Sequence, residues 1–209
     1  MEITKHVHLL EAMKGSYVYL ILGEEPVLID TGLKSKFSSL ESSLQALGMR
    51  FEDIAHIILT HQDVDHIGNA KALKAASKAT LWSSVEDKPY IQGERKGTGV
   101  RKMIQTLLKV DHPTIDQTFA PGQRIGDLEV IPSPGHTPGH VCLLYHDVLL
   151  AGDLVKTSRG KVSPSPNFLA SDKEALRRSI REVAKLSFDY ICPAHGEPVR
   201  GHSLFDLML

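Results

Sequence analysis

The segment Thr60–Gly68 constrains this chain more than any other part of its sequence. It follows an apolar run at residues 54–59 that reads as a buried strand, and it precedes a helical pattern at residues 69–76. In extended chain, alternate side chains point the same way, so His61 and Asp63 can share one ion. If the chain then turns into the helix, the next two donors can face a second ion. Within six residues the segment holds four potential metal ligands: His61, Asp63, Asp65 and His66.

Three further clusters of this kind follow apolar runs. Gly135-His136-Thr137-Pro138-Gly139-His140 offers two histidines in a loop rich in glycine and proline, Gly152-Asp153 offers a carboxylate, and His195-Gly196 offers another imidazole. One such residue alone is more often structural, and the first segment alone could be a polar loop with capping aspartates. Four such strand ends in one chain favour a metal site, because imidazole and carboxylate are common ligands of divalent ions.

The hydrophobic pattern predicts strands in two groups, one in each half of the chain, with helices between them. This alternation indicates sheets covered by helices on their outer faces. The expected strands are residues 16–22, 27–29, 54–59, 80–82, 128–131, 141–145, 148–151 and 190–192. The expected helices are 35–47, ended by Gly48, then 69–76, 100–110, and one that Ser171 caps and that runs to about Leu186.

Composition excludes several classes of protein. The chain has 209 residues, a formal net charge of -1 and 42% hydrophobic residues, which suits a globular protein with a real core. Without a long basic tract, neither nucleic acid nor a membrane is the expected partner. The small basic clusters are expected to be solvated helix faces: Lys71, Lys74 and Lys78, and Arg177, Arg178 and Arg181.

Cysteine usage and the N-terminal sequence bear on the compartment. Cys142 and Cys192 lie in separate apolar stretches, which gives no disulfide framework and fits a reducing compartment. Residues 1–6 lack the apolar core of a signal peptide, and the longest apolar run is too short to span a bilayer. We therefore expect a cytoplasmic protein.

Together these motifs resemble those of the metallo-β-lactamase superfamily, whose pattern is His-x-His-x-Asp-His followed by Gly-His, Gly-Asp and a final His-Gly. The resemblance runs in the same order from Leu28-Ile29-Asp30-Thr31-Gly32 to His195-Gly196, nearly the whole chain. It implies the α/β (α+β) class and an αββα sandwich of two mixed β-sheets flanked by helices, with metals at one edge between the sheets. We expect a single domain over residues 1–209, with an irregular lid-like segment at about 83–118.

The resemblance also implies a role for each site residue. His61, Asp63 and His136 would hold the first metal, and Asp65, His66 and His195 the second, with Asp153 bridging the two. Asp30 would orient a ligand from outside the coordination shell. His140 is expected to be structural rather than a ligand, because an imidazole in a Gly-Pro loop usually needs partners for both nitrogens.

Asp63 departs from the family pattern, because it replaces the motif's second histidine. A third carboxylate lowers the net charge of the site by one unit and makes its water less acidic. Two divalent ions are expected, with zinc first; iron or manganese is favoured more than usual by an anionic oxygen ligand. Our hypothesis is that Asp63 binds metal, because an unpaired buried carboxylate is costly. The alternative leaves the first site partly empty.

The leading hypothesis is a metallo-hydrolase that uses a metal-bound hydroxide on an ester, thioester, lactone or amide bond of a small molecule. Asp65 is the expected catalytic residue, which orients the hydroxide and passes on the proton. The main alternative is a di-iron or mononuclear iron oxidoreductase of the same fold, which Asp63 favours. A non-catalytic relative, a nuclease and a secreted antibiotic-degrading enzyme fit the sequence less well.

Substrate choice is expected to depend on loops outside the motifs. The irregular segment 83–118 and the loop at residues 156–164 are the expected walls of the substrate site, because long loops often carry specificity. Arg159 and Lys161 in the second loop could meet an anionic group. The alternative is that both are solvated.

Overall fold

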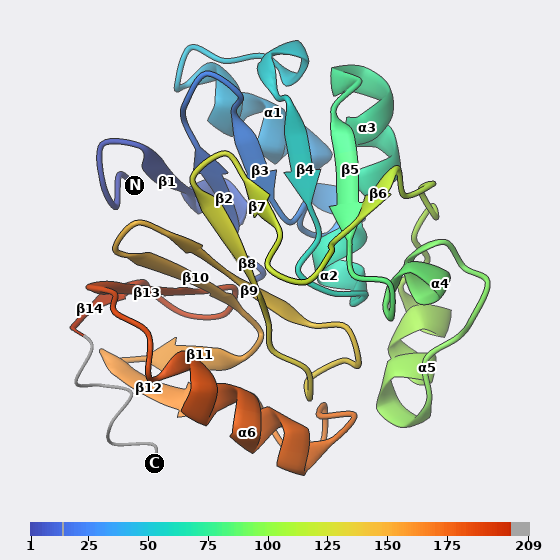
Figure 1. The fold of residues 1–209 in the computed structure, drawn as a ribbon. Helices are drawn as coiled ribbons and strands as arrows, with labels where there is room; N and C mark the ends of the chain where they lie inside the picture. Colours follow the sequence, from blue (N-terminus) through green and yellow to red (C-terminus); the bar gives the residue numbers. More distant parts are fainter. Residues whose placement is uncertain (14, 202–209) are drawn as a thin grey trace. The chain divides into compact units, whose positions relative to one another are not determined.

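The computed structural model describes residues 1–13 and 15–201, and it divides the chain into two compact units, Met1–Thr118 and Phe119–Leu209. Each unit contains one six-stranded sheet and its own hydrophobic core, and each is described here by itself (Figure 1). The two groups of strands expected from the sequence are thus confirmed. The single-domain organisation stays a prediction.

The sheet of the first unit has the order β1-β2-β3-β4-β5-β6. The pairs β1–β2 and β2–β3 are antiparallel, and β3 to β6 run parallel, so the sheet is mixed. In the parallel part, all strands end at one edge, which is where α/β sheets build their sites. The strands are β1 (Val7–Leu10), β2 (Val18–Ile21), β3 (Val27–Ile29), β4 (His56–Ile58), β5 (Thr80–Ser83) and β6 (Gln117–Thr118).

Helices α1 and α3 cover one face of this sheet (Figure 1). One row of side chains in register, Leu20, Leu28, Ile57 and Leu81, packs against them in a single core cluster. Leu40 and Leu44 of α1 and Leu73 of α3 reach that row from the helices. The helices of this unit are η1 (Glu11–Met13), η2 (Lys34–Lys36), α1 (Phe37–Gln45), η3 (Phe51–Asp53), α2 (Val64–Ile67), α3 (Ala70–Ser77), α4 (Lys88–Ile91) and α5 (Gly99–Leu107).

The sheet of the second unit has the order β14-β13-β10-β9-β8-β7, and it is mixed because β13 runs parallel to β10 while the other pairs are antiparallel. A separate hairpin pairs β11 with β12. The strands are β7 (Arg124–Ile125), β8 (Leu128–Pro132), β9 (Val141–Tyr145), β10 (Val148–Gly152), β11 (Val155–Ser158), β12 (Lys161–Pro164), β13 (Tyr190–Pro193) and β14 (Val199–Arg200).

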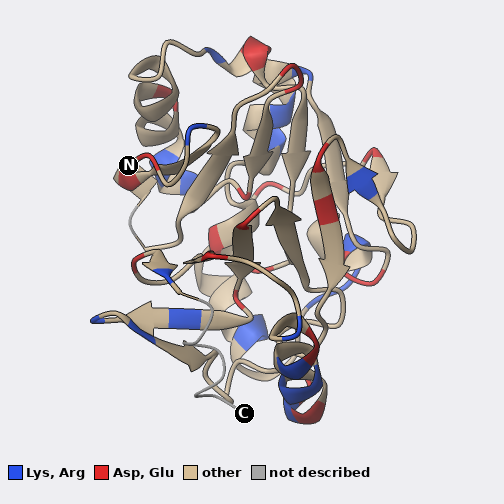
Figure 2. Cartoon of the chain, turned by 60° about the vertical axis from the view of Figure 1, so that its left-hand side comes forward, with Lys and Arg blue, Asp and Glu red and all other residues tan. Residues whose placement is uncertain are grey.

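Helix α6 (Lys173–Val183) covers this second sheet. Its apolar side chains Leu176, Ile180 and Val183 pack with Leu149 of β10 and Ile191 of β13 in one core cluster. The expected basic cluster at Arg177, Arg178 and Arg181 lies on the exposed side of α6, where charged segments are visible in Figure 2. An amphipathic helix of this kind is stabilised mainly by burial of its apolar face.

Two local expectations were wrong. The N-cap of α6 is Asp172 rather than Ser171, because the Asp172 carboxylate accepts the backbone N–H groups of Glu174 and Ala175 at 2.9 Å. Ser171 instead donates its hydroxyl to the carbonyl of His136 at 3.0 Å. The expected loop at residues 156–164 is the β11–β12 hairpin, whose turn has positive φ at Arg159 and Gly160.

Both cysteines are buried and neither forms a disulfide, as expected. Burial raises the pKa of the Cys142 thiol to about 12, so this thiol is protonated at neutral pH. In the described residues, no helix combines the length and the apolar character needed to cross a bilayer.

Candidate metal centre

The motif loop of the first unit begins where β4 ends, beside the end of β3. Asp30 follows β3 with a positive φ of 61°, a conformation that aspartate tolerates better than most residues. One of its carboxylate oxygens accepts the backbone N–H of Thr60, and the other accepts the Thr60 hydroxyl, both at 2.8 Å. Asp30 therefore ties the start of the motif loop to the neighbouring parallel strand.

The same carboxylate orients two histidines. The Nδ1–H of His66 donates to Asp30 at 2.8 Å, and His61 Nδ1 lies 3.0 Å from the Thr60 hydroxyl oxygen. Because that hydroxyl donates its own proton to Asp30, it accepts the Nδ1–H of His61. The hydrogen-bond pattern therefore assigns the Nδ1–H tautomer to both rings, so each Nε2 carries the lone pair that a metal needs. The Ser16 hydroxyl lies 3.3 Å from Nε2 of His66, a contact that a bound ion would replace.

Backbone contacts hold the motif loop in place. Thr31 donates its hydroxyl to the carbonyl of His66 at 2.7 Å, and Asn69 donates its side-chain amide to the carbonyl of Thr31 at 2.6 Å. Gly68 approaches the 32–34 segment so closely that a Cβ there would overlap the backbone of Gly32 and Lys34. The small residue at this position is thus required by packing rather than by backbone conformation.

Asp87 is a contributor to this loop that the sequence analysis missed. Its fully buried carboxylate accepts the backbone N–H of Gln62 at 3.0 Å, between the two motif residues His61 and Asp63. A buried aspartate a few residues after β5 is a weak sequence signal, since position alone does not say which loop it contacts.

Arg101 of α5 is the second residue that the sequence analysis missed. Its Nε donates to Asp63 Oδ1 at 2.5 Å and its Nη2 to Asp63 Oδ2 at 3.0 Å, a bidentate ion pair. Both side chains are largely buried, at 10% and 15% exposure. The positive charge of Arg101 offsets the extra negative charge of Asp63, so the pair has the same net charge as the neutral histidine of the family pattern.

In the second unit, Asp153 lies between two histidines. Asp153 Oδ2 is 3.4 Å from His136 Nε2, and Asp153 Oδ1 is 3.4 Å from His195 Nε2. β10 and β13 lie side by side, and the backbone N–H of Ala194 donates to the carbonyl of Gly152, which brings the two strand ends together. Each oxygen of one carboxylate thus faces a different imidazole, the arrangement that a bridging ligand requires.

His140 uses both ring nitrogens in contacts within the second unit. Its Nε2 accepts the backbone N–H of Asp153 at 2.9 Å, and its Nδ1 lies 2.9 Å from the Ser133 hydroxyl. The ring is almost fully buried. With both nitrogens occupied, His140 has no lone pair directed at an ion and holds Asp153 instead.

Hydrogen bonds hold both the ring and the backbone of His136. Its Nδ1 shares a hydrogen bond of 3.1 Å with the Ser165 hydroxyl, while its carbonyl accepts from Ser171. The preceding Gly135 has a φ of 136° and packs on the start of α6, where a Cβ would overlap the backbone of Leu176. The loop is therefore pinned to the helix that covers the sheet.

The donor spacing within each unit tests whether metal ions fit. Two atoms bound to one tetrahedral zinc at about 2.0–2.1 Å lie about 3.3 Å apart. The separations between imidazole and carboxylate are 3.4 Å for both Asp153 pairs, 3.5 Å for His61–Asp63 and 3.8 Å for His66–Asp65. These distances exceed those of direct hydrogen bonds and suit ligands that share an ion. The residues present therefore fit metal ions.

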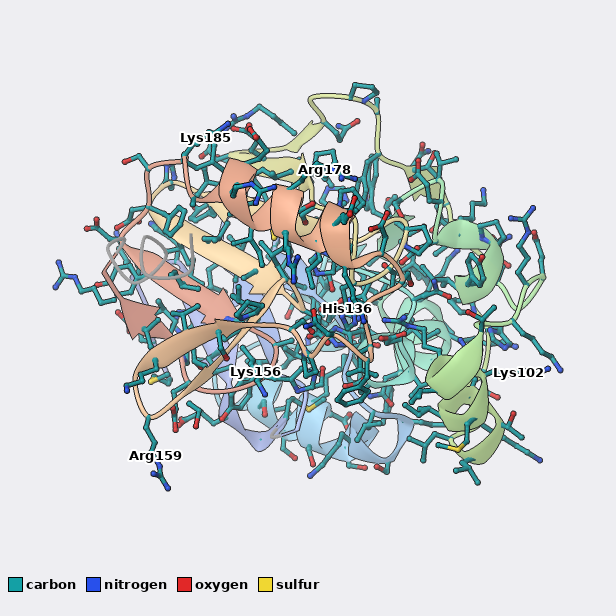
Figure 3. The ribbon with its side chains drawn as sticks, turned by 90° about the horizontal axis from the view of Figure 1, so that it is seen from below. Lys102, His136, Lys156, Arg159, Arg178 and Lys185 are labelled. Carbon is teal, nitrogen blue, oxygen red and sulfur yellow. The ribbon has the colours of Figure 1, made fainter. Side chains whose placement is uncertain are left out.

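The structure thus groups the expected site residues in two sets. Asp30, His61, Asp63, Asp65 and His66 come together in the first unit, and His136, His140, Asp153 and His195 come together in the second. Arg159 and Lys161 do not join the second set: both are exposed at the β11–β12 hairpin, and Arg159 points away from His136 in Figure 3. This placement favours the alternative that both are solvated.

Comparison with known proteins gives the same fold and family. A solved structure of a metallo-beta-lactamase family protein from Thermus thermophilus superposes with a TM-score of 0.74 at 23% identity, over 99% of this chain and 79% of that one. The uncharacterized protein YobT of Bacillus subtilis is 30% identical, over 88% of this chain and 84% of its own. The probable metallo-hydrolase YflN of the same organism is 27% identical, over 96% of this chain and 87% of its own length.

The family model described as the metallo-beta-lactamase superfamily matches residues 13–195, which include every proposed metal ligand named above. The two mixed sheets with flanking helices are the fold of that family. The chain belongs to the metallo-β-lactamase superfamily.

Proposed function

We propose that the chain is a metal-dependent hydrolase that cleaves an ester, thioester, lactone or amide bond of a small molecule. The observation that carries this proposal is the position of Asp153, whose two oxygens each lie 3.4 Å from a histidine Nε2. YflN, named a probable metallo-hydrolase, supports the same reaction class.

In this proposal the two residue sets together hold two divalent ions, zinc by first expectation. The first ion would be held by His61, Asp63 and His136, the second by Asp65, His66 and His195, and Asp153 would serve both. When bound, such ions make water more acidic and polarise the oxygen of the bond to be cleaved. Asp30 and His140 keep their neighbours in position, as their hydrogen bonds to His66 and to the backbone of Asp153 suggest.

Asp65 is the proposed catalytic residue. Its carboxylate is partly exposed, at 26%, whereas the neighbouring His66 ring is fully buried. A partly exposed carboxylate at this position can accept a proton from the attacking water and pass it to the leaving group. Its Oδ2 lies 3.8 Å from Nε2 of His66, the other motif residue that would hold the second ion.

The alternative function is an iron oxidoreductase of the same fold, which the carboxylate at Asp63 favours. Arg101 weakens this argument, because it neutralises the charge that would select a harder ion. A small-molecule substrate and a cytoplasmic location remain part of the proposal. The protonated, buried cysteines fit a reducing compartment.

The test is elemental analysis of protein purified without added metal, followed by an ester, thioester and lactone panel on the same sample. Zinc or manganese, with hydrolysis that a chelator abolishes and the metal restores, is expected. Iron together with oxygen-dependent turnover and no hydrolysis would establish the alternative instead.

A further inference from the structure

The ion pair between Arg101 and Asp63 bears on how tightly the first ion can be held. A carboxylate has about four lone-pair positions on its two oxygens. The guanidinium occupies one position on each oxygen of Asp63, at 2.5 and 3.0 Å. A metal must therefore use one of the remaining positions, on a carboxylate whose negative charge is already drawn toward a cation.

Burial strengthens the competition between the Arg101 guanidinium and a metal ion for the Asp63 carboxylate. Arg101 is anchored in α5 with a side chain only 10% exposed, and Asp63 is 15% exposed. Solvent screening of the pair is weak at such sites, in contrast to exposed pairs. The second ion's carboxylate, Asp65, is the more exposed of the two motif aspartates, at 26%, so its charge is better screened by solvent.

We propose that Arg101 restrains Asp63 and makes the first metal site much weaker than the second, so that the chain binds its two ions in sequence. This inference rests on the proposed metal dependence. Arg101 is then a positioning residue, since it acts on the ion through Asp63. Asp63 thereby differs from the family's histidine at this position, because its affinity for the ion is set by Arg101 of α5.

Zinc titration of the metal-stripped protein against a competing chelator tests this. The wild-type chain is expected to bind one zinc tightly and a second at least about tenfold more weakly. Arg101→Gln is expected to strengthen the second equivalent by about tenfold or more. Asp63→His combined with Arg101→Gln restores the family motif and should bind two zinc ions tightly, which checks that the other ligands are intact.

Arg50→Gln is the matched control. Arg50 pairs with Asp53 at 3.7 Å in an exposed position, 75% exposed, so the same charge is removed away from the motif. Its zinc affinities should equal those of the wild type. The melting temperature of each metal-stripped variant, with and without zinc, separates altered binding from altered folding.

Two equally tight sites in the wild type would overturn the inference, as would a weaker or unchanged second site in Arg101→Gln. A chain that binds no zinc overturns both this inference and the proposed function. A chain that binds two ions equally and hydrolyses the panel overturns the inference alone.

A second observation, independent of the first, concerns a cavity of about 460 Å³ in the first unit, a volume typical of small-molecule sites. Val64 and Ile67 of α2, which flank Asp65 and His66, form part of its wall. The rest comes from residues of α4 and α5, from residues 109–112, and from Lys34, Gly93, Arg95 and Lys96. The cavity therefore adjoins the short helix that carries two of the proposed metal ligands.

Its charge is strongly positive. The wall includes Arg95, Lys96, Lys102 and Lys109, none of which has a carboxylate within 4 Å in the part of the chain that the structure describes. The one acidic side chain of the wall, Asp111, pairs with Lys34 at 2.9 Å, which lowers the pKa of Asp111. In a chain whose net charge is -1, this concentration of cations is local.

The geometry points to a binding site for the anionic group, phosphate or carboxylate, of the small-molecule substrate. This rests on the proposed hydrolase function and names its substrate class. It also moves the anion site from the exposed Arg159–Lys161 hairpin to α5, whose Lys102 is labelled in Figure 3. The limited volume favours a small molecule over a polymer.

Inorganic phosphate, titrated into the metal-stripped protein and followed by backbone amide NMR shifts, tests this site. Shifts are expected at residues 95–109, with affinity reduced at least about tenfold in Lys102→Gln/Lys109→Gln and unchanged in the control Lys78→Gln, an exposed lysine at the C-terminal end of α3. Shifts confined elsewhere, or a double variant that binds normally, would overturn it. Phosphate binding without any hydrolysis of the panel would sink the proposed function and leave this site.

Discussion

The ring of His140 accepts the backbone N–H of Asp153 through Nε2 at 2.9 Å, and so fixes the residue proposed to bridge the two ions. His140→Ala should leave that buried N–H without its acceptor and let the carboxylate shift. We expect the affinity for zinc to fall about 10- to 100-fold, as for other residues that support ligands. Competition with a chelator measures it. A wild-type affinity in a folded variant would contradict this role.

Asp65→Asn tests the proposed catalytic residue. An amide cannot accept the proton of the attacking water, so turnover at saturating zinc should fall by about 100-fold or more while the fold persists. Circular dichroism checks the fold, and zinc content checks that the loss is not one of metal. Near-normal turnover in the zinc-loaded variant would exclude this role for Asp65.

Gly135→Ala should destabilise the second unit by about 3 kcal/mol or more, because the new Cβ overlaps the backbone at the start of α6 and the backbone has a φ of 136°. Gly126→Ala is the control. That glycine also has a positive φ, 56°, but no atom within 4 Å of a new Cβ, so it should cost only about 1–2 kcal/mol. Urea unfolding of both variants gives the comparison, and equal losses would show that close packing at Gly135 is unimportant.

The α6 cap predicts a pH effect. Hydrogen bonds from the backbone N–H groups of Ala175 and Glu174 lower the pKa of Asp172 below its ordinary value. A lowered folded-state pKa gives stability that is present above the unfolded-state pKa and is lost as pH falls through the folded-state one.

Asp172→Ala should therefore lower the melting temperature at neutral pH, whereas Asp172→Asn should keep the cap and lose this acid-dependent part. Thermal melts of both variants between neutral and acidic pH measure the effect. If Asp172→Ala melts like the wild type at neutral pH, the cap contributes nothing.

Strand and helix positions followed from the sequence where burial dominated. The runs that became β4, β9, β10 and β13 are almost wholly apolar, which is the pattern of strands inside a covered sheet. The β11–β12 hairpin was missed because its strands are short and mostly polar, with one aliphatic side chain and one lysine in each. The signal available in the sequence was Gly160, whose turn has positive φ at both Arg159 and Gly160 in the structure.

The proposed metal ligands were identifiable because each follows a strand within a short local motif. The residues that position these ligands were harder to identify from the sequence. Asp30 was recognisable from its motif, but Arg101 is 38 residues from Asp63 and Asp87 is 25 residues from Gln62. Only the fold brings these pairs together, so no spacing pattern predicts them. The charge argument made from Asp63 alone was incomplete for that reason.

The most direct test of the account is the zinc content of Asp153→Asn beside that of the wild type, after both are loaded with zinc and dialysed. The wild-type chain should retain at least one ion, and the variant, which loses the carboxylate between His136 and His195, should retain none with comparable affinity. A wild-type chain that binds no divalent ion, or a variant that keeps its full complement, would contradict the account.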